Sequence, residues 1–140
     1  MTFEEMMQRA IYQFNADWDD YEDYAPHVDA YVNDGYDQVL YALTDYHLDD
    51  LPVFPTLTTD NPEEVPKVPQ WTHFPIADYA TYCMYRNGNP QKQQRGQEFL
   101  RRFMDCLSKC GDLKGKCSVN TETGELTFRQ SLPQFHNYWP

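Results

Sequence analysis

A short turn at Asn87, Gly88, Asn89 and Pro90 constrains the fold of this chain more than any other feature. Glycine is the residue type that adopts a positive φ just past a helix end, asparagine can cap the helix that follows, and proline is preset for a first helical turn. The turn therefore predicts that one helix ends and another begins within a few residues. Two antiparallel helices joined in this way form an αα-hairpin.

Apolar residues recur at helical spacing on both sides of this turn. Those before it are Ile76, Tyr79, Ala80, Cys83 and Met84, and those after it are Phe99, Leu100, Phe103, Cys106, Leu107 and Cys110. Spacings of three and four place each set on one face of its helix. The pattern predicts a hairpin over residues 71–111 whose two apolar faces pack together, with Phe103 in the core.

Two further helices are predicted closer to the N-terminus. Thr2 and Glu5 have the spacing of a capping box, and the apolar stripe that follows predicts a short helix ending near Asn15. Residues 17–24 are acidic and aromatic without a helical period, so they are predicted to form a loop. Pro26 then opens a long second helix. Its apolar stripe is Val28, Tyr31, Val32, Gly35, Tyr36, Val39, Leu40 and Leu43.

The remaining segments are predicted to be irregular or extended. Prolines recur within residues 51–70, which excludes a regular helix and predicts an ordered, partly polyproline linker. After Gly111 the pattern becomes extended, and residues 116–121 and 125–130 predict a β-hairpin or a strand-like arm. Large apolar residues near the C-terminus need a surface to dock on, either on this domain or on a neighbour.

The predicted fold class is all-α. It has four helices, of which the second is long and the third and fourth form the αα-hairpin. Residues 1–111 form the helical domain, which includes the proline-rich linker, and residues 112–140 form the extended arm.

Charge is distributed unevenly along the 140 residues. Residues 1–65 contain 16 acidic side chains and one basic side chain, Arg9, whereas residues 66–140 contain 10 basic and 6 acidic side chains. Such a distribution disfavours nonspecific DNA binding through the acidic half. It favours a partner, or a second copy of the chain, that carries the opposite charge pattern. A solvated acidic surface is the simpler alternative.

Three groups of residues are candidates for an interface. On the fourth predicted helix three basic residues recur every seven positions and so line one side. Acidic residues of the second helix in another copy are their candidate partners, with DNA or plain solvation of the basic side as the alternatives. Three aromatic residues of the C-terminal tail complete the set. The candidates are Arg95, Arg102, Lys109, Asp29, Asp34, Asp37, Phe135, Tyr138 and Trp139.

The sequence offers weak signals for metal binding. The best zinc candidate combines Cys106, Cys110 and Cys117 with Cys83 or His136, but cysteines four apart on an apolar helix face are typical of core packing. An acidic cluster resembles a calcium loop, yet it lacks the central glycine and the terminal glutamate at the required spacing. That cluster is Asp17, Asp19, Asp20, Glu22 and Asp23.

Catalytic motifs are equally weak. The chain has no glycine-rich phosphate loop, nucleophile elbow or His-Glu-x-x-His pair. The histidines have no nucleophile placed beside them, so capping or surface roles are predicted for His27, His47 and His73. Three tyrosines at a spacing of three are assigned to packing: Tyr79, Tyr82 and Tyr85. We therefore expect no catalytic, cofactor or metal site.

The N-terminal segment helps to predict the cellular compartment of the protein. Met1 leads into a polar, acidic stretch, which argues against a secretory signal, and no run approaches the roughly 20 apolar residues of a membrane span. We expect a protein of the reducing cytoplasm, in which the cysteines act as small apolar residues.

Three segments resemble the helices of small tailed-phage head–tail connector proteins, the neck adaptors that attach beneath the portal. They are residues 27–36, residues 77–82 and residues 87–92, with Phe99 and Phe103 after them. The order of elements is also similar: a short first helix, a helix with a Tyr-x-Asn core, a variable linker and an αα-hairpin. The resemblance covers about residues 2–110, and the proline-rich linker and the arm have no counterpart in it.

This resemblance implies a structural virion or prophage protein without catalysis or cofactor, which assembles as a ring around the DNA channel. Its partners would be the portal protein, neighbouring copies and other neck proteins, with DNA as passing cargo and no membrane. It would occupy the host cytoplasm during assembly and then the virion neck. The alternative is a prophage regulatory or protein-binding module that acts as a monomer or dimer through its tyrosine-rich surface. An enzyme that uses the carboxylates of the acidic half is the least favoured class.

Overall fold

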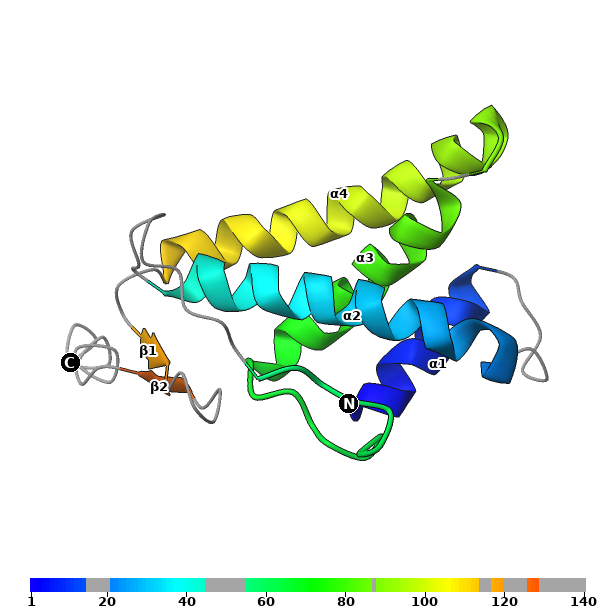
Figure 1. The fold of residues 1–140 in the computed structure, drawn as a ribbon. Helices are drawn as coiled ribbons and strands as arrows, with labels where there is room; N and C mark the ends of the chain where they lie inside the picture. The colour runs from blue at the N-terminus through cyan, green and yellow to red at the C-terminus, as the bar shows by residue number, and fades with distance from the viewer. Residues whose placement is uncertain (15–20, 45–54, 87, 114–116, 120–125, 129–140) are drawn as a thin grey trace.

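The computed structural model describes residues 1–14, 21–44, 55–86, 88–113, 117–119 and 126–128. Its helices are α1 (Phe3–Gln13), α2 (Tyr21–Leu43), the short 3₁₀ helix η3 (Gln70–Thr72), α3 (His73–Tyr85) and α4 (Pro90–Asp112). Two strands follow, β1 (Cys117–Val119) and β2 (Leu126–Phe128). The prediction of an all-α fold built on four helices is confirmed (Figure 1).

The predicted start of α1 is confirmed. The Thr2 Oγ1 atom accepts a hydrogen bond from the Glu5 backbone N–H at 3.1 Å, and Glu5 Oε1 accepts one from the Thr2 N–H at 3.0 Å. This reciprocal pair satisfies two backbone donors at the helix start.

The predicted turn between α3 and α4 is also present. Asn89 caps α4, because its Oδ1 atom accepts a hydrogen bond from the Lys92 N–H at 2.9 Å, and Pro90 is the first helical residue. Gly88, however, does not adopt a positive φ. A Cβ atom at Gly88 would lie 2.7 Å from the Lys92 Cβ atom, so glycine is needed here for close packing.

The predicted boundary of α2 is wrong. The helix begins at Tyr21, so residues 21–24 are helical, and Pro26 lies inside the helix. Pro26 is the sixth residue of the helix, beyond the first four residues whose N–H groups have no intrahelical partner, so it removes one backbone donor from the helix interior.

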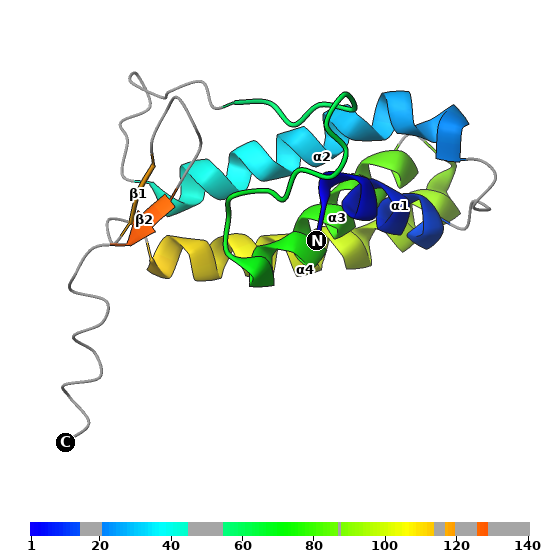
Figure 2. The same ribbon diagram turned by 90° about the horizontal axis from the view of Figure 1, so that it is seen from below.

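Helix α3 packs against each of the other three helices. Two glycines permit this close packing: a Cβ atom at Gly35 would lie 3.1 Å from the Tyr79 ring, and one at Gly96 would lie 2.9 Å from the Tyr85 Cβ atom. Helices α2 and α4 run side by side in the same direction (Figures 1 and 2). The shared core contains Phe103, as predicted, together with Phe3, Met6, Met7, Leu40, Leu43, Ile76, Cys83, Cys106 and Cys110.

Residues 55–69 of the linker cross the outside of α1 and α2 (Figure 2). The free N–H groups at the start of α1 donate to this segment: Phe3 N–H donates to the Glu64 carbonyl at 2.8 Å and Glu4 N–H to the Pro62 carbonyl at 2.9 Å. The linker is therefore ordered over its described part, as predicted. Its backbone supplies partners that the helix start otherwise lacks.

Strands β1 and β2 pair antiparallel, with Ser118 opposite Thr127. They lie within the predicted arm. The three tail residues named as interface candidates, Phe135, Tyr138 and Trp139, lie outside the described residues.

Candidate functional site: an acidic groove and the Phe74 face

The three predicted acidic interface residues lie around one groove on the outside of α2. Asp29, Asp34 and Asp37 form part of one wall, and linker residues 56–59 form the other. The hollow measures about 510 Å³. No lysine or arginine lines it. We call this feature the acidic groove.

The groove exists because Asn33 holds the linker against α2. The Leu57 N–H donates to Asn33 Oδ1 at 2.8 Å, and Asn33 Nδ2 donates to the Leu57 carbonyl at 2.9 Å. Asn33 lies one turn from both Asp29 and Asp37, since residues four apart share a helix face. The sequence marked Asn33 through the Tyr-x-Asn pattern, but nothing in it identified Leu57 as the partner.

The carboxylates of the groove differ in their surroundings. Asp34 accepts hydrogen bonds from the Tyr79 hydroxyl and from Gln38 Nε2, so it ties α2 to α3. Burial, and then the nearby Asp34 charge, raise the pKa of Asp37. The Asp37 carboxylate makes no hydrogen bond to another described residue, and the Asp29 carboxylate accepts one only from the adjacent Ala30 N–H among them. Asp29 and Asp37 therefore keep carboxylate oxygens available for a cation. A cation bound there would reduce the repulsion between the Asp34 and Asp37 carboxylates.

The three basic candidates of α4 are not equivalent. Arg95 and Lys109 are exposed and form no ion pair within the described part of the chain. Arg102 is exposed as well, but its Nε atom lies 3.8 Å from Glu98 Oε1 and its guanidinium carbon 5.4 Å from the Phe99 ring centroid. Among the described residues, Arg95 and Lys109 are the members of this set without an ion pair.

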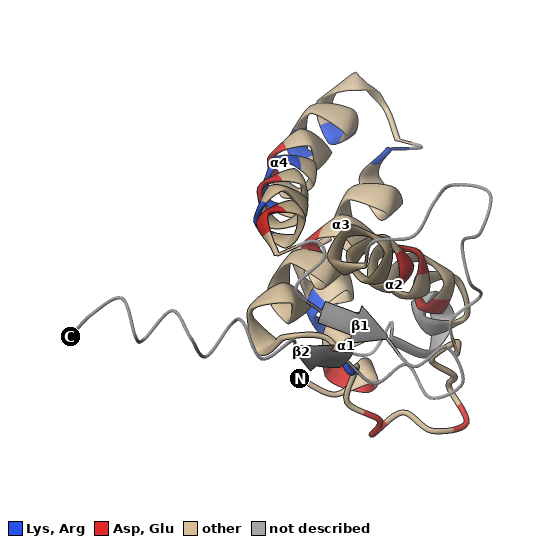
Figure 3. Ribbon diagram, turned by 90° about the vertical axis from the view of Figure 1, so that its left-hand side faces the viewer, with Lys and Arg blue, Asp and Glu red and all other residues tan. Residues whose placement is uncertain are grey.

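The outer side of α4 also carries acidic residues. Glu98, Asp105 and Asp112 each follow one of the basic candidates by three positions and are exposed. Glu98 is paired with Arg101, whose Nη2 atom lies 2.7 and 2.8 Å from its carboxylate oxygens. Figure 3 accordingly shows both signs of charge along α4. The side is mixed in sign rather than uniformly basic.

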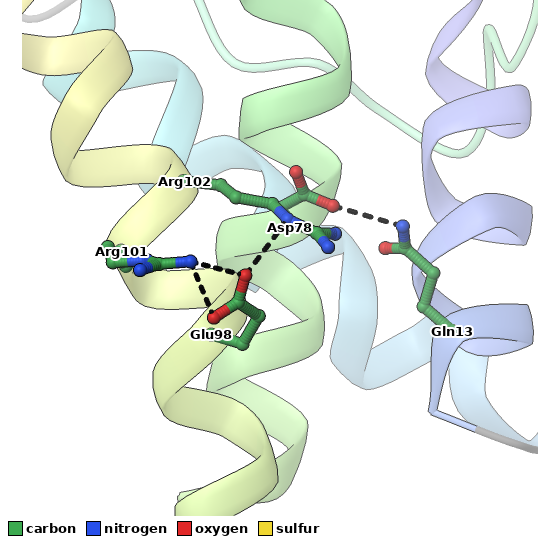
Figure 4. A network of polar contacts seen from close by, with 5 residues as sticks. All are labelled: Gln13, Asp78, Glu98, Arg101 and Arg102. Carbon is green, nitrogen blue, oxygen red and sulfur yellow. Dashed lines mark hydrogen bonds and ion pairs between the residues drawn. The ribbon is translucent and has the colours of Figure 1, made fainter.

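A buried carboxylate on α3 is held by a side chain of α1. Asp78 is 5% exposed and accepts a hydrogen bond from Gln13 Nε2 of α1 at 3.0 Å (Figure 4). Burial raises the pKa of Asp78, while the hydrogen bond from Gln13 and the charges of Arg102 and Arg9 act in the opposite direction. The fold thus brings Arg9, the one basic residue of the acidic half, to the same carboxylate as Arg102 of α4.

Two large aromatic side chains are exposed on η3 and at the start of α3. Phe74 is 52% exposed and Trp71 is 43% exposed, and the Arg9 guanidinium carbon lies 4.2 Å from the Phe74 ring centroid. We call the surface formed by Arg9, Trp71, Phe74, Asp78 and Arg102 the Phe74 face. Sequence reasoning missed it, because its members come from three helices and from η3.

The remaining sequence candidates take ordinary structural positions. His27 is exposed, whereas His73 is buried, so the surface role predicted for His73 is wrong. Its Nε2 atom bonds to the Val68 carbonyl at 3.1 Å, and its Nδ1 atom lies 3.0 Å from the Met1 amino nitrogen. Tyr79 and Tyr85 are buried, which confirms their assignment to packing.

Only some of the zinc and calcium candidates belong to the residues that the structure describes. Cys83, Cys106 and Cys110 are buried, as expected for packing residues. Cys117 belongs to β1, and Glu22 and Asp23 belong to α2. The other members of the two sets lie outside the described residues: Asp17, Asp19, Asp20 and His136. His47 also lies outside them. In the described part of the chain no three His, Cys, Asp or Glu side chains are grouped to hold a metal ion. None of its helices has the length and apolar character of a membrane span.

Comparison with known proteins returns no match, whether to a family model, to a curated protein or to a solved structure. The class of protein is therefore defined by the fold and its surfaces alone. They describe an all-α domain with an acidic groove along α2 and an aromatic, arginine-bearing face across α1, α3 and α4.

Proposed function

We propose that this chain is a structural protein of the tailed-phage neck, a head–tail connector that assembles as a ring beneath the portal. The acidic groove carries the proposal: Asp29 and Asp37 border a hollow without a basic residue, while arginines lie on other helices of the same molecule. The resemblance of residues 27–36 and of the αα-hairpin to neck adaptors points the same way.

A ring of identical subunits needs a heterologous interface, in which one patch meets a different patch on the next copy. Figure 3 shows acidic residues on α2, and basic residues interspersed with acidic ones along α4. A cation from a neighbour would stabilise the ionised form of the half-buried Asp37, whose pKa is raised in the isolated chain. Charge complementarity of this kind sets specificity and orientation more than raw affinity.

The net charge sets the conditions for assembly. At −11 per chain, copies repel one another over long distances at low ionic strength. At physiological ionic strength this repulsion is screened beyond about 8 Å, whereas contacts between adjacent charges persist. We therefore expect association to be strongest at intermediate salt and to weaken at both extremes.

The test combines the chain with the purified portal assembly of the same phage. Mass in solution is measured by sedimentation velocity over a salt series, and the complex is imaged by electron microscopy. A ring of this chain on the portal is the expected result. A chain that stays monomeric or dimeric and does not bind the portal contradicts the proposal and favours the regulatory module.

A matched pair of variants tests the acidic groove itself. Asp29→Asn combined with Asp37→Asn removes two charges from the groove, and Asp60→Asn combined with Glu63→Gln removes two exposed charges outside it. Both pairs change the net charge equally. Assembly should be weakened by the first pair and retained by the second.

A further inference from the structure

We infer that the Phe74 face of one copy docks into the acidic groove of the next copy. The inference rests on the proposed function, since it names the two surfaces that a ring of these subunits would join. Opposite charges would permit several contacts between copies, and the inferred pairing is one of them.

The Phe74 face has the composition of an interaction hot spot. Phe74 and Trp71 are large, half-exposed rings only three residues apart, a spacing that places side chains on one side of a helical turn. Aromatic residues and arginine dominate the centres of protein interfaces. Arg9 already lies over the Phe74 ring, so the cation and the ring are ordered together before a partner arrives. Order of this kind lowers the entropy lost on binding.

The hydrogen bond behind the Phe74 face helps to fix its shape. Asp78 is buried and held by Gln13, and the charges of Arg9 and Arg102 lower the pKa of its carboxylate against the effect of burial. The Arg9 guanidinium supplies a positive charge over the Phe74 ring, while Arg102 lies 3.8 Å from Glu98 Oε1. Figure 4 shows the hydrogen bond from Gln13 of α1 to Asp78 of α3, with Arg102 of α4 nearby and paired with Glu98.

The acidic groove offers the complementary chemistry. Asp29 and Asp37 provide carboxylate oxygens for a guanidinium group, the partner that arginine binds best. Leu57, which is 4% exposed, contributes an apolar surface from the linker wall. The volume of about 510 Å³ lies within the roughly 300–1,000 Å³ of pockets that enclose small organic groups.

A second copy is the occupant that these surfaces favour. The acidic groove is built on α2 and the linker, whereas the Phe74 face is built on α1, α3 and α4. The two surfaces are unlike, so pairing them between copies gives a head-to-tail contact that can close into a ring. DNA is disfavoured in the groove because both would be negatively charged.

Photo-crosslinking of the full-length chain tests this pairing. Phe74 is replaced by p-benzoylphenylalanine, and isotope-labelled chains are mixed with unlabelled chains so that products between copies are recognised by mass. We expect products that join position 74 of one copy to residues 29–37 or 56–59 of another. The same replacement at Met104, which is 51% exposed on α4, should give no such product.

Charge exchange gives an independent readout by sedimentation. Arg9→Glu should weaken self-association about tenfold, and adding Asp29→Lys and Asp37→Lys should restore it to within about threefold. Arg101→Glu is the control, because Arg101 is exposed and paired with Glu98 within the same chain, and it should change association less than about twofold. Phe74→Ala, at a half-exposed position, should preserve folding and also weaken association about tenfold.

The outcomes separate the inference from the proposed function. Crosslinks from position 74 to another part of the second copy, or none at the highest soluble concentration, overturn the pairing. In that case portal binding by the unmodified chain still supports a connector. Absence of portal binding overturns the proposed function even if copies of the chain pair as inferred.

Discussion

Asn33 of α2 exchanges two hydrogen bonds with the backbone of Leu57 in the linker, one accepted by Oδ1 at 2.8 Å and one donated by Nδ2 at 2.9 Å. These two hydrogen bonds resemble the pair between neighbouring β-strands, except that one partner is a side chain. It fixes residues 56–59 beside Asp29 and Asp37 and so creates the second wall of the acidic groove.

Replacing Asn33 should therefore loosen the linker. Asn33→Ala leaves the Leu57 N–H and carbonyl without protein partners, and we expect a loss of about 1–3 kcal/mol in the free energy of unfolding, measured by urea titration. Thr58→Ala, at an exposed position in the same segment, should cost less than about 0.5 kcal/mol. Equal losses in the two variants would show that the Asn33 pair does not hold the linker.

The core of the hairpin should be sensitive to Phe103. This side chain is fully buried, and its ring centroid lies 4.6 Å from that of Tyr79. Phe103→Ala should lower the free energy of unfolding by about 3–5 kcal/mol through lost burial and a residual cavity. The neighbouring Met104 is half-exposed, so Met104→Ala should cost less than about 1 kcal/mol. A loss below about 1 kcal/mol for Phe103→Ala would place the ring outside the energetic core.

His73 should make stability depend on pH. Burial, and then the nearby Met1 amino group, lower the pKa of His73 below its ordinary value of 6.5. The unfolded chain therefore binds this proton more strongly than the folded chain, and the free energy of unfolding should fall as the pH drops below about 6.5.

The difference in the free energy of unfolding between the native protein and the His73→Gln variant isolates the contribution of His73. Urea titrations from about pH 8 to pH 5 should show the native protein losing more stability than the variant. Asp37 and Asp78 have raised pKa values and act in the opposite direction at lower pH, but they are common to both proteins and cancel. A pH-independent difference would mean that His73 has a similar pKa in the folded and unfolded chains.

Reversing the exposed charges of α4 should affect assembly and not folding. Arg95→Glu combined with Lys109→Glu should leave the melting temperature nearly unchanged, because exposed charges contribute little to stability. If this side of α4 meets a neighbouring copy, association falls, and reversal of Asp29 and Asp37 restores it. Failure of the acidic reversal to restore association would show that Asp29 and Asp37 do not pair with this side of α4. Unchanged association would leave a solvated surface as the explanation.

Deletion of residues 118–140 tests the predicted role of the arm in assembly. We expect helix content by circular dichroism and cooperative melting to be nearly unchanged, since the described core lies in α1 to α4 and the linker. Association with the portal or with another copy should weaken, because Phe135, Tyr138 and Trp139 are lost. Unfolding of the truncated chain would instead make the arm part of the monomer fold.

The sequence by itself determined the local elements of this protein. Thr2 with Glu5, and Asn89 with Pro90, specified two helix starts, because capping depends on residues only three or four positions apart. The apolar spacing around Phe103 likewise specified which faces would be buried. The start of α2 escaped prediction, because proline favours the first helical turn, whereas Pro26 lies inside the helix.

Only the tertiary structure decided which distant residues meet. It joined Asn33 to Leu57, Tyr79 to Asp34, and Gln13 to Asp78. The contacts of Arg102 with Glu98 and Phe99 are local by contrast, since these residues lie four and three positions before it on α4. Helical periodicity reports the face of a helix on which a side chain lies but not the surface that packs against it. That choice depends on interhelical contacts and on the path of the linker, neither of which is encoded by spacing along the chain.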